Sequence, residues 1–117
     1  MKRAKRIAVG LALLGSVLFA PGVSASEDDA TQPITKHYVS VSGGQLHYVT
    51  AGEGDPVLLL HQAPLSHAEF LETIPILARH FRVIAWDAPG HGNSYIPDHE
   101  YEFLEYLGAL EEFVDAL

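Results

Sequence analysis

The stretch Val83-Ile84-Ala85-Trp86-Asp87-Ala88-Pro89-Gly90-His91-Gly92-Asn93-Ser94 decides how the rest of the chain folds. Its first four residues form an apolar run that ends abruptly in Asp87 and a segment rich in proline and glycine. This pattern predicts a strand buried on both faces that delivers a polar loop at its carboxyl end. Sites in open parallel sheets collect at that end of the strands. The stretch therefore predicts a functional site in an α/β protein.

The segments before this stretch supply the other strands. His37–Val41 and Gln45–Ala51 alternate apolar and polar residues, and Gly43-Gly44 between them supplies the positive φ angles of a tight turn. We therefore expect an antiparallel hairpin. The apolar run Val57–Leu60 is typical of a central parallel strand.

Two helices complete the pattern. Ser66 and Glu69 have the spacing of a capping box, so a helix is expected to follow them, with Pro75 breaking or kinking it. A second helix runs from about Tyr101 to the end of the chain, without a clear cap. The expected apolar faces of the two helices are Phe70, Leu71, Ile74 and Leu77 in the first, and Phe103, Leu107, Leu110, Val114 and Leu117 in the second. The order is strand, strand, strand, helix, strand, helix, with a right-handed crossover between the two parallel strands.

The first 25 residues have the layout of a secretory signal peptide. A basic start is followed by the apolar run Ile7–Ala20 and the small-residue cleavage pattern Val23-Ser24-Ala25. The run is shorter than the roughly 20 residues of a membrane-spanning helix, although an uncleaved anchor is the alternative. We expect an exported protein, periplasmic or extracellular, with 1–25 as signal, 26–36 as a flexible lead-in and 37–117 as one incomplete domain.

Charge and cysteine content exclude several classes of partner and cross-link. The formal net charge is −8, and removal of 1–25 would leave Lys36, Arg79 and Arg82 against all 15 acidic residues, a net charge of −12. So acidic a chain is repelled by nucleic acid and by anionic membrane surfaces, and we expect no stable membrane insertion after cleavage. No disulfide can form, because the chain has no cysteine.

Two loops give the chain a specific family resemblance. The hairpin, then Leu-Leu-Leu-His-x-x-Pro ending at Pro64, a helix, and Asp-x-Pro-Gly-His-Gly-x-Ser over 87–94 resemble the N-terminal part of the α/β-hydrolase fold. The resemblance covers essentially all of 37–117. It implies a hydrolase sheet that stops before the nucleophile elbow, and a small-molecule substrate for the full-length relative.

The first loop, His61-Gln62-Ala63-Pro64, resembles the family's His-Gly-x-Pro segment. By that resemblance the N–H of Ala63 is half of an oxyanion hole, while Pro64 has no N–H to give. Gln62 departs from the family's usual glycine, and its side chain either disfavours the backbone conformation or adds an amide donor. Ala63 stands where haloalkane dehalogenases usually have a halide-holding asparagine, which disfavours dehalogenation. His61 is interpreted as a packed structural histidine that bonds loop backbone.

The second loop is interpreted mainly as scaffold. Asp87 is expected to be a structural carboxylate that accepts loop amides, because the family's triad acid follows its nucleophile. Gly90 and Gly92 supply turn conformations, and His91 is a weaker candidate for lining the pocket. Ser94 lies in half of a Gly-x-Ser-x-Gly elbow, but no strand directly precedes Gly92 and the final glycine is missing, so a structural serine is expected.

The resemblance implies a nucleophile, a triad acid and a histidine that this sequence does not contain. We therefore expect an inactive N-terminal portion of an exported serine-type hydrolase of a small ester or lactone, with no cofactor. The far edge of Val57–His61 would be bare, which predicts self-association.

Alternatives remain open. One is an epoxide hydrolase or another non-ester hydrolase of this fold, and a second is a non-catalytic fragment or a binding partner completed by a second chain. A third, a nucleotide-binding half-domain, is disfavoured because no helix begins at Gly92. No histidine pair has metal-ligand spacing on a helix, so no metal site is expected.

Overall fold

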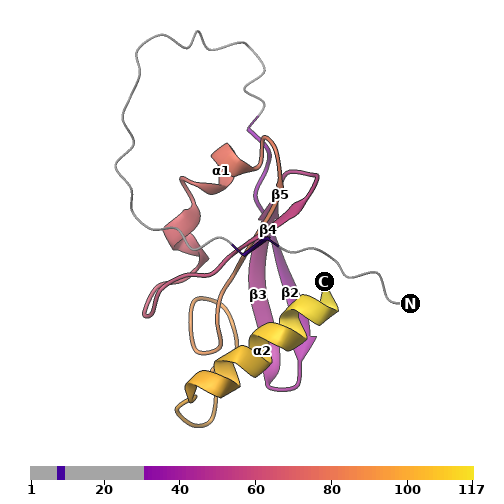
Figure 1. The fold of residues 1–117 in the computed structure, drawn as a ribbon. Helices are drawn as coiled ribbons and strands as arrows, with labels where there is room; N and C mark the ends of the chain where they lie inside the picture. The colour runs from indigo at the N-terminus through magenta and orange to yellow at the C-terminus, as the bar shows by residue number, and fades with distance from the viewer. Residues whose placement is uncertain (1–7, 10–30) are drawn as a thin grey trace, which may run out of the picture.

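A computed structural model describes residues 8–9 and 31–117 of the chain (Figure 1). The predicted signal peptide and the lead-in therefore lie outside the described residues, apart from 8–9 and 31–36. The elements are β1 (Ala8–Val9), β2 (Thr35–Val41), β3 (Gly44–Ala51), β4 (Pro56–Leu59), the 3-10 helix η1 (His67–Phe70), α1 (Ile74–Leu77), β5 (Arg82–Trp86) and α2 (Phe103–Ala116). None of the helices in these ranges is long and apolar enough to cross a membrane.

The strands form one mixed sheet in the order β1-β4-β5-β3-β2. β4 and β5 are parallel, with Val57 opposite Val83, and β5 pairs antiparallel with β3. The predicted hairpin and the predicted strand–helix–strand unit are both present, and they confirm the α/β class. β2 begins two residues earlier than the sequence pattern indicated.

A bare far edge of β4 is the expectation for the chain from which residues 1–25 have been removed, and that form is not the one described. In the 117-residue chain, β1, which lies in the predicted signal peptide, covers part of this edge. β1 pairs with it in parallel, with Ala8 opposite Val57 and Val9 opposite Leu58. An unpaired strand edge leaves N–H and C=O groups without partners, and an extended apolar segment of the same chain satisfies some of them.

The turn of the β2–β3 hairpin uses its glycines differently from the prediction. Gly44 has φ +147°, but Gly43 does not have a positive φ. The ring of Tyr95 packs on both, so a Cβ atom would lie 2.3 Å from a Tyr95 atom at Gly43 and 2.7 Å from one at Gly44. Close approach of the loop that follows β5, as well as backbone conformation, therefore requires glycine here.

The first predicted helix is divided into two short pieces. η1 ends at Phe70 and α1 begins at Ile74, so Pro75 lies in the first turn of α1, where its missing N–H removes no helical hydrogen bond. Ser66 caps η1 as predicted, accepting a hydrogen bond from the N–H of Ala68. Glu69 does not complete a capping box, because its carboxylate binds Gln62 instead.

The second predicted helix is present as α2, and its expected face is confirmed in part, because Leu110, Val114 and Leu117 pack against the core. Phe113 is fully buried and packs against Trp86, whereas Phe103 is 72% exposed and Leu107 is 44% exposed. α2 also has the cap that the sequence did not reveal: Glu102 and Glu105 form a reciprocal capping box.

The core lies on both faces of the sheet. Val83 and Ala85 of β5 face a cluster with η1 and α1, and Ile84 and Trp86 face a second cluster with α2. α2 lies across β2 and β3 (Figure 1). This two-sided burial fixes the loops at the carboxyl ends of β4 and β5, where the candidate site is found.

Candidate functional site

Asp87, directly after β5, is the centre of the hydrogen-bonding around the two loops. Its side chain is fully buried, and Oδ1 accepts the backbone N–H of His67 at 2.7 Å while Oδ2 accepts that of Asn93 at 2.9 Å. Gly92 lies so close that a Cβ atom there would be 2.1 Å from the carboxylate. The loop after β5 therefore wraps tightly around Asp87, and glycine is needed at 92.

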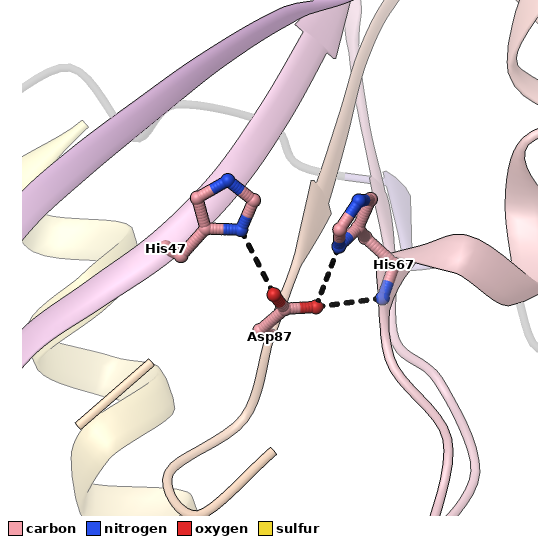
Figure 2. A group of neighbouring side chains, drawn as sticks. All are labelled: His47, His67 and Asp87. Atoms are coloured by element: carbon pink, nitrogen blue, oxygen red, sulfur yellow. Dashed lines mark hydrogen bonds and ion pairs between the residues drawn. The ribbon is translucent and has the colours of Figure 1, made fainter. Parts of the chain in front are cut away.

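Two histidines also bind this carboxylate, and Figure 2 shows them on either side of it. His47 of β3 lies 2.8 Å away through Nδ1, and His67 of η1 lies 2.9 Å away through Nδ1. We call these three residues the Asp87 cluster. Neither histidine was predicted from the sequence as part of a site. The one local signal for His47 is its position between Leu46 and Tyr48 on a strand whose two faces are covered.

The pKa of Asp87 follows from these contacts. Burial favours the neutral acid, but the N–H groups of His67 and Asn93 and the two imidazoles outweigh it, so the pKa of Asp87 falls below 3.8. Because an ionised carboxylate only accepts, each Nδ1 must carry a proton. The Nε2 of His47 is buried and has no hydrogen-bond partner among the described residues.

The Asp87 cluster also has the donor set of a cation site, since its three ligand atoms lie within 4.8 Å of one another. The sequence spacing had given no sign of it. However, four N–H groups already occupy the carboxylate. A metal-bound imidazole also usually donates its other N–H to an acceptor, and His47 has none in the described part of the chain. The geometry therefore fits a hydrogen-bonded anchor better than a metal centre.

Ser94 joins the second loop to β3. Its hydroxyl accepts the N–H of His47 at 2.9 Å and donates to the backbone carbonyl of Asp87. The side chain is thus buried and fully used between two backbone segments, and it does not project into an open site.

His61 links the two loops. Its Nε2 accepts the N–H of Ala88 at 3.0 Å, and its Nδ1 lies 2.9 Å from the carbonyl of Gln62. The imidazole of His91 lies against it, with ring centroids 5.1 Å apart. Both nitrogens of His61 are therefore engaged by loop backbone, and His91 contacts this face.

Ala63 has an unused backbone donor at the position that the family resemblance assigns to the oxyanion hole. Ala63, Gln62 and Pro64 are all exposed. Within the described ranges the N–H of Ala63 makes no hydrogen bond, whereas its neighbours Gln62 and Leu65 both donate.

The two glycines of the second loop adopt the turn conformations predicted for them. Gly90 has φ +78° and Gly92 has φ +49°, and both values favour glycine.

The sequence is similar to a known family of proteins and to several of its characterised members. A sequence model described as the alpha/beta hydrolase fold matches residues 55–117, more than half of the chain. The chain is 38% identical over 85 residues to the 2-hydroxy-6-oxo-6-(2'-aminophenyl)hexa-2,4-dienoic acid hydrolase of Metapseudomonas resinovorans, covering 70% of this chain and 29% of that one. It is 48% identical over 64 residues to the soluble epoxide hydrolase of Corynebacterium sp. (strain C12), covering 55% and 22%.

Two further proteins extend the range of activities. The chain is 34% identical over 98 residues to a haloalkane dehalogenase of Mesorhizobium japonicum (strain LMG 29417 / CECT 9101 / MAFF 303099), covering 80% of this chain and 32% of that one. A crystal structure of a serine hydrolase involved in carbazole degradation superposes with a TM-score of 0.69 at 36% identity, covering 73% and 34%. The chain spans less than a third of the length of these curated relatives. It belongs to the α/β-hydrolase fold family.

Proposed function

We propose that the protein carrying this chain hydrolyses a small ester or lactone by serine-type acyl transfer, with the β4–η1 loop as one side of its oxyanion hole. The observation that carries the proposal is the unpartnered N–H of Ala63 at the carboxyl end of β4. A backbone donor at that place stabilises negative charge as it develops on the substrate carbonyl oxygen.

The chemistry divides between this chain and residues that it does not supply. A serine oxygen attacks the acyl carbon, the carbonyl oxygen becomes an oxyanion held by N–H donors, and water later releases the acid. The 117 residues contain no Gly-x-Ser-x-Gly elbow. We therefore propose that the nucleophile is supplied by a part of the protein outside these residues. One oxyanion donor alone changes kcat by about 10²–10³-fold.

Epoxide opening is the second candidate, and the 48% identity to a soluble epoxide hydrolase favours it. There the proposed nucleophile is a carboxylate instead of a serine. Dehalogenation is disfavoured because Ala63 has no side-chain donor for a halide, despite the similarity to a haloalkane dehalogenase.

The test uses the complete gene product with a nitrophenyl ester, an aryl epoxide and a haloalkane, together with a fluorophosphonate that labels active serines. We expect ester turnover and a single fluorophosphonate adduct by mass spectrometry. Epoxide turnover without an adduct would replace acyl transfer by the second candidate. A folded, soluble protein inactive on all three would point to a non-catalytic product.

We also propose export through the first 25 residues, which is supported by their charge and apolar pattern. N-terminal sequencing of protein recovered outside the cytoplasm is expected to begin at Ser26. A full-length N-terminus in that fraction would indicate an uncleaved anchor instead.

A further inference from the structure

In the peptide group between Gln62 and Ala63, the carbonyl oxygen has hydrogen-bond partners and the N–H has none among the described residues. The carbonyl accepts the N–H of Leu65 at 2.7 Å, and the Nδ1 of His61 lies 2.9 Å from the same oxygen. In a planar trans peptide the N–H points opposite to the C=O. Two donors on the carbonyl therefore aim the N–H of Ala63 away from the loop interior, where it has no partner among the described residues.

A second set of contacts fixes the other side of Gln62. Glu69 Oε2 accepts the backbone N–H of Gln62 at 3.0 Å, and Glu69 Oε1 accepts from its side-chain Nε2 at 3.3 Å. We call this two-point contact the Gln62–Glu69 brace. Gln62 does not have a positive φ, so its side chain does not force the backbone into a left-handed conformation. The amide is used inside the loop to bind Glu69.

The brace starts from a firmly anchored element. Glu69 lies in η1, whose first residue, His67, holds Asp87 through both its backbone N–H and its Nδ1. Asp87 is fully buried at the end of β5. The contacts therefore run from the core, through Asp87 and His67, to Glu69 and then to Gln62, the residue directly before the N–H of Ala63.

We propose that Glu69 is a positioning residue, which holds the Gln62–Ala63 peptide so that the N–H of Ala63 stays aimed at the substrate oxygen. The direction of the N–H rests on the hydrogen bonds above, and its use by substrate rests on the proposed function. In this chain the Gln62–Glu69 brace fixes the loop by side-chain contacts at a position where the family usually has glycine.

The test compares Glu69→Ala, which removes both contacts, with Glu69→Gln, whose amide oxygen still accepts the Gln62 N–H. Glu72→Ala is the matched control, because Glu72 is an exposed acid nearby with no hydrogen bond in the described part of the chain. All variants are made in the complete gene product. Two readouts are used: amide hydrogen exchange and chemical shift at Gln62 and Ala63 by NMR, and kcat and KM on the ester.

We expect Glu69→Ala to speed exchange at Gln62 at least tenfold, to shift the Ala63 amide, and to lower kcat about 10–100-fold with KM within about twofold. Glu69→Gln should keep kcat within about threefold of the parent. Unchanged Gln62 and Ala63 amides in Glu69→Ala would overturn the proposal, as would a normal kcat despite altered amides. A parent without turnover would reject the proposed function, and the amide measurements alone would then decide whether Glu69 positions this peptide.

Discussion

At the scale of single residues, Asp87 and the groups around it are the strongest determinants of local structure. A buried carboxylate is stable only when its oxygens are hydrogen-bonded, and four N–H groups are directed at this one. The motif residues Gly92 and Ser94 act on the same point, one by leaving room for the carboxylate and the other by holding the Asp87 backbone.

Replacing Asp87 by asparagine tests this arrangement. The amide NH₂ would face N–H groups that need an acceptor, so we expect a loss of about 3–5 kcal/mol in the free energy of unfolding, measured by urea denaturation at neutral pH. His47→Asn keeps an N–H donor near the position of Nδ1, so we expect a smaller loss than from Asp87→Asn.

The same contacts set the acid dependence of stability. Because the folded pKa of Asp87 lies below 3.8, its contribution is present above that pH and lost as the pH falls through the folded pKa. Asp87→Asn should remove this dependence. Equal stability of parent and Asp87→Asn at neutral pH would contradict the anchoring role.

At the scale of elements, the start of α2 carries a pH-sensitive surface contact. The imidazole of His99 lies 2.7 Å from Asp98 through Nδ1 and 2.7 Å from Glu105 through Nε2. Glu105 also accepts the N–H of Glu102 in the capping box. Protonated His99 therefore bridges two carboxylates, one of which belongs to the cap of the helix.

The pKa of His99 is raised above 6.5 by its hydrogen bonds to Asp98 and Glu105. The stabilisation is therefore complete below pH 6.5 and is lost as the pH rises through the folded pKa. An NMR titration of the His99 ring should give a midpoint above 6.5 that moves down in 1 M salt, because the groups are exposed. His99→Ala should remove the pH dependence of amide protection, meaning exchange corrected for its intrinsic base-catalysed rate, in the first turn of α2. A midpoint at or below 6.5 would contradict the bridge.

At the scale of the whole molecule, the sheet is held by one apolar cluster on each face. The α2 side depends on Phe113, which packs against Trp86 and, edge-on, against Tyr48. Phe103, at the other end of the same helix, is mostly exposed.

Phe113→Ala and Phe103→Ala are therefore a matched pair. We expect Phe113→Ala to lower the free energy of unfolding by about 3–5 kcal/mol and Phe103→Ala to change it by less than about 0.5 kcal/mol. Thermal denaturation of both variants checks this. Similar losses from the two would contradict the burial of Phe113 and the exposure of Phe103.

The contrast between these two phenylalanines also shows what the sequence could predict. The strand at Val83 can be predicted because an apolar run bounded by a turn-rich segment marks it, and neighbours such as Val83 and Ile84 then face opposite sides of the sheet. The buried face of α2 is harder to predict, because apolar residues at helical spacing cover more than one face of α2 and only packing on the sheet decides which is buried. His47, His67 and Asp87 lie far apart in the sequence, and their meeting depends on strand register and on the path of η1.

Glu112 of α2 closes the hairpin turn, with one oxygen 2.6 Å from the N–H of Ser42 and the other 2.6 Å from its hydroxyl. The two residues are 70 positions apart. At roughly 5–20 residues per second of synthesis, Glu112 follows Ser42 by about 4–14 s. During that interval the turn has no helix over it, and a two-stranded hairpin alone is only marginally stable in water. The Ser42–Glu112 contact therefore ties the completion of the hairpin turn to the synthesis of α2.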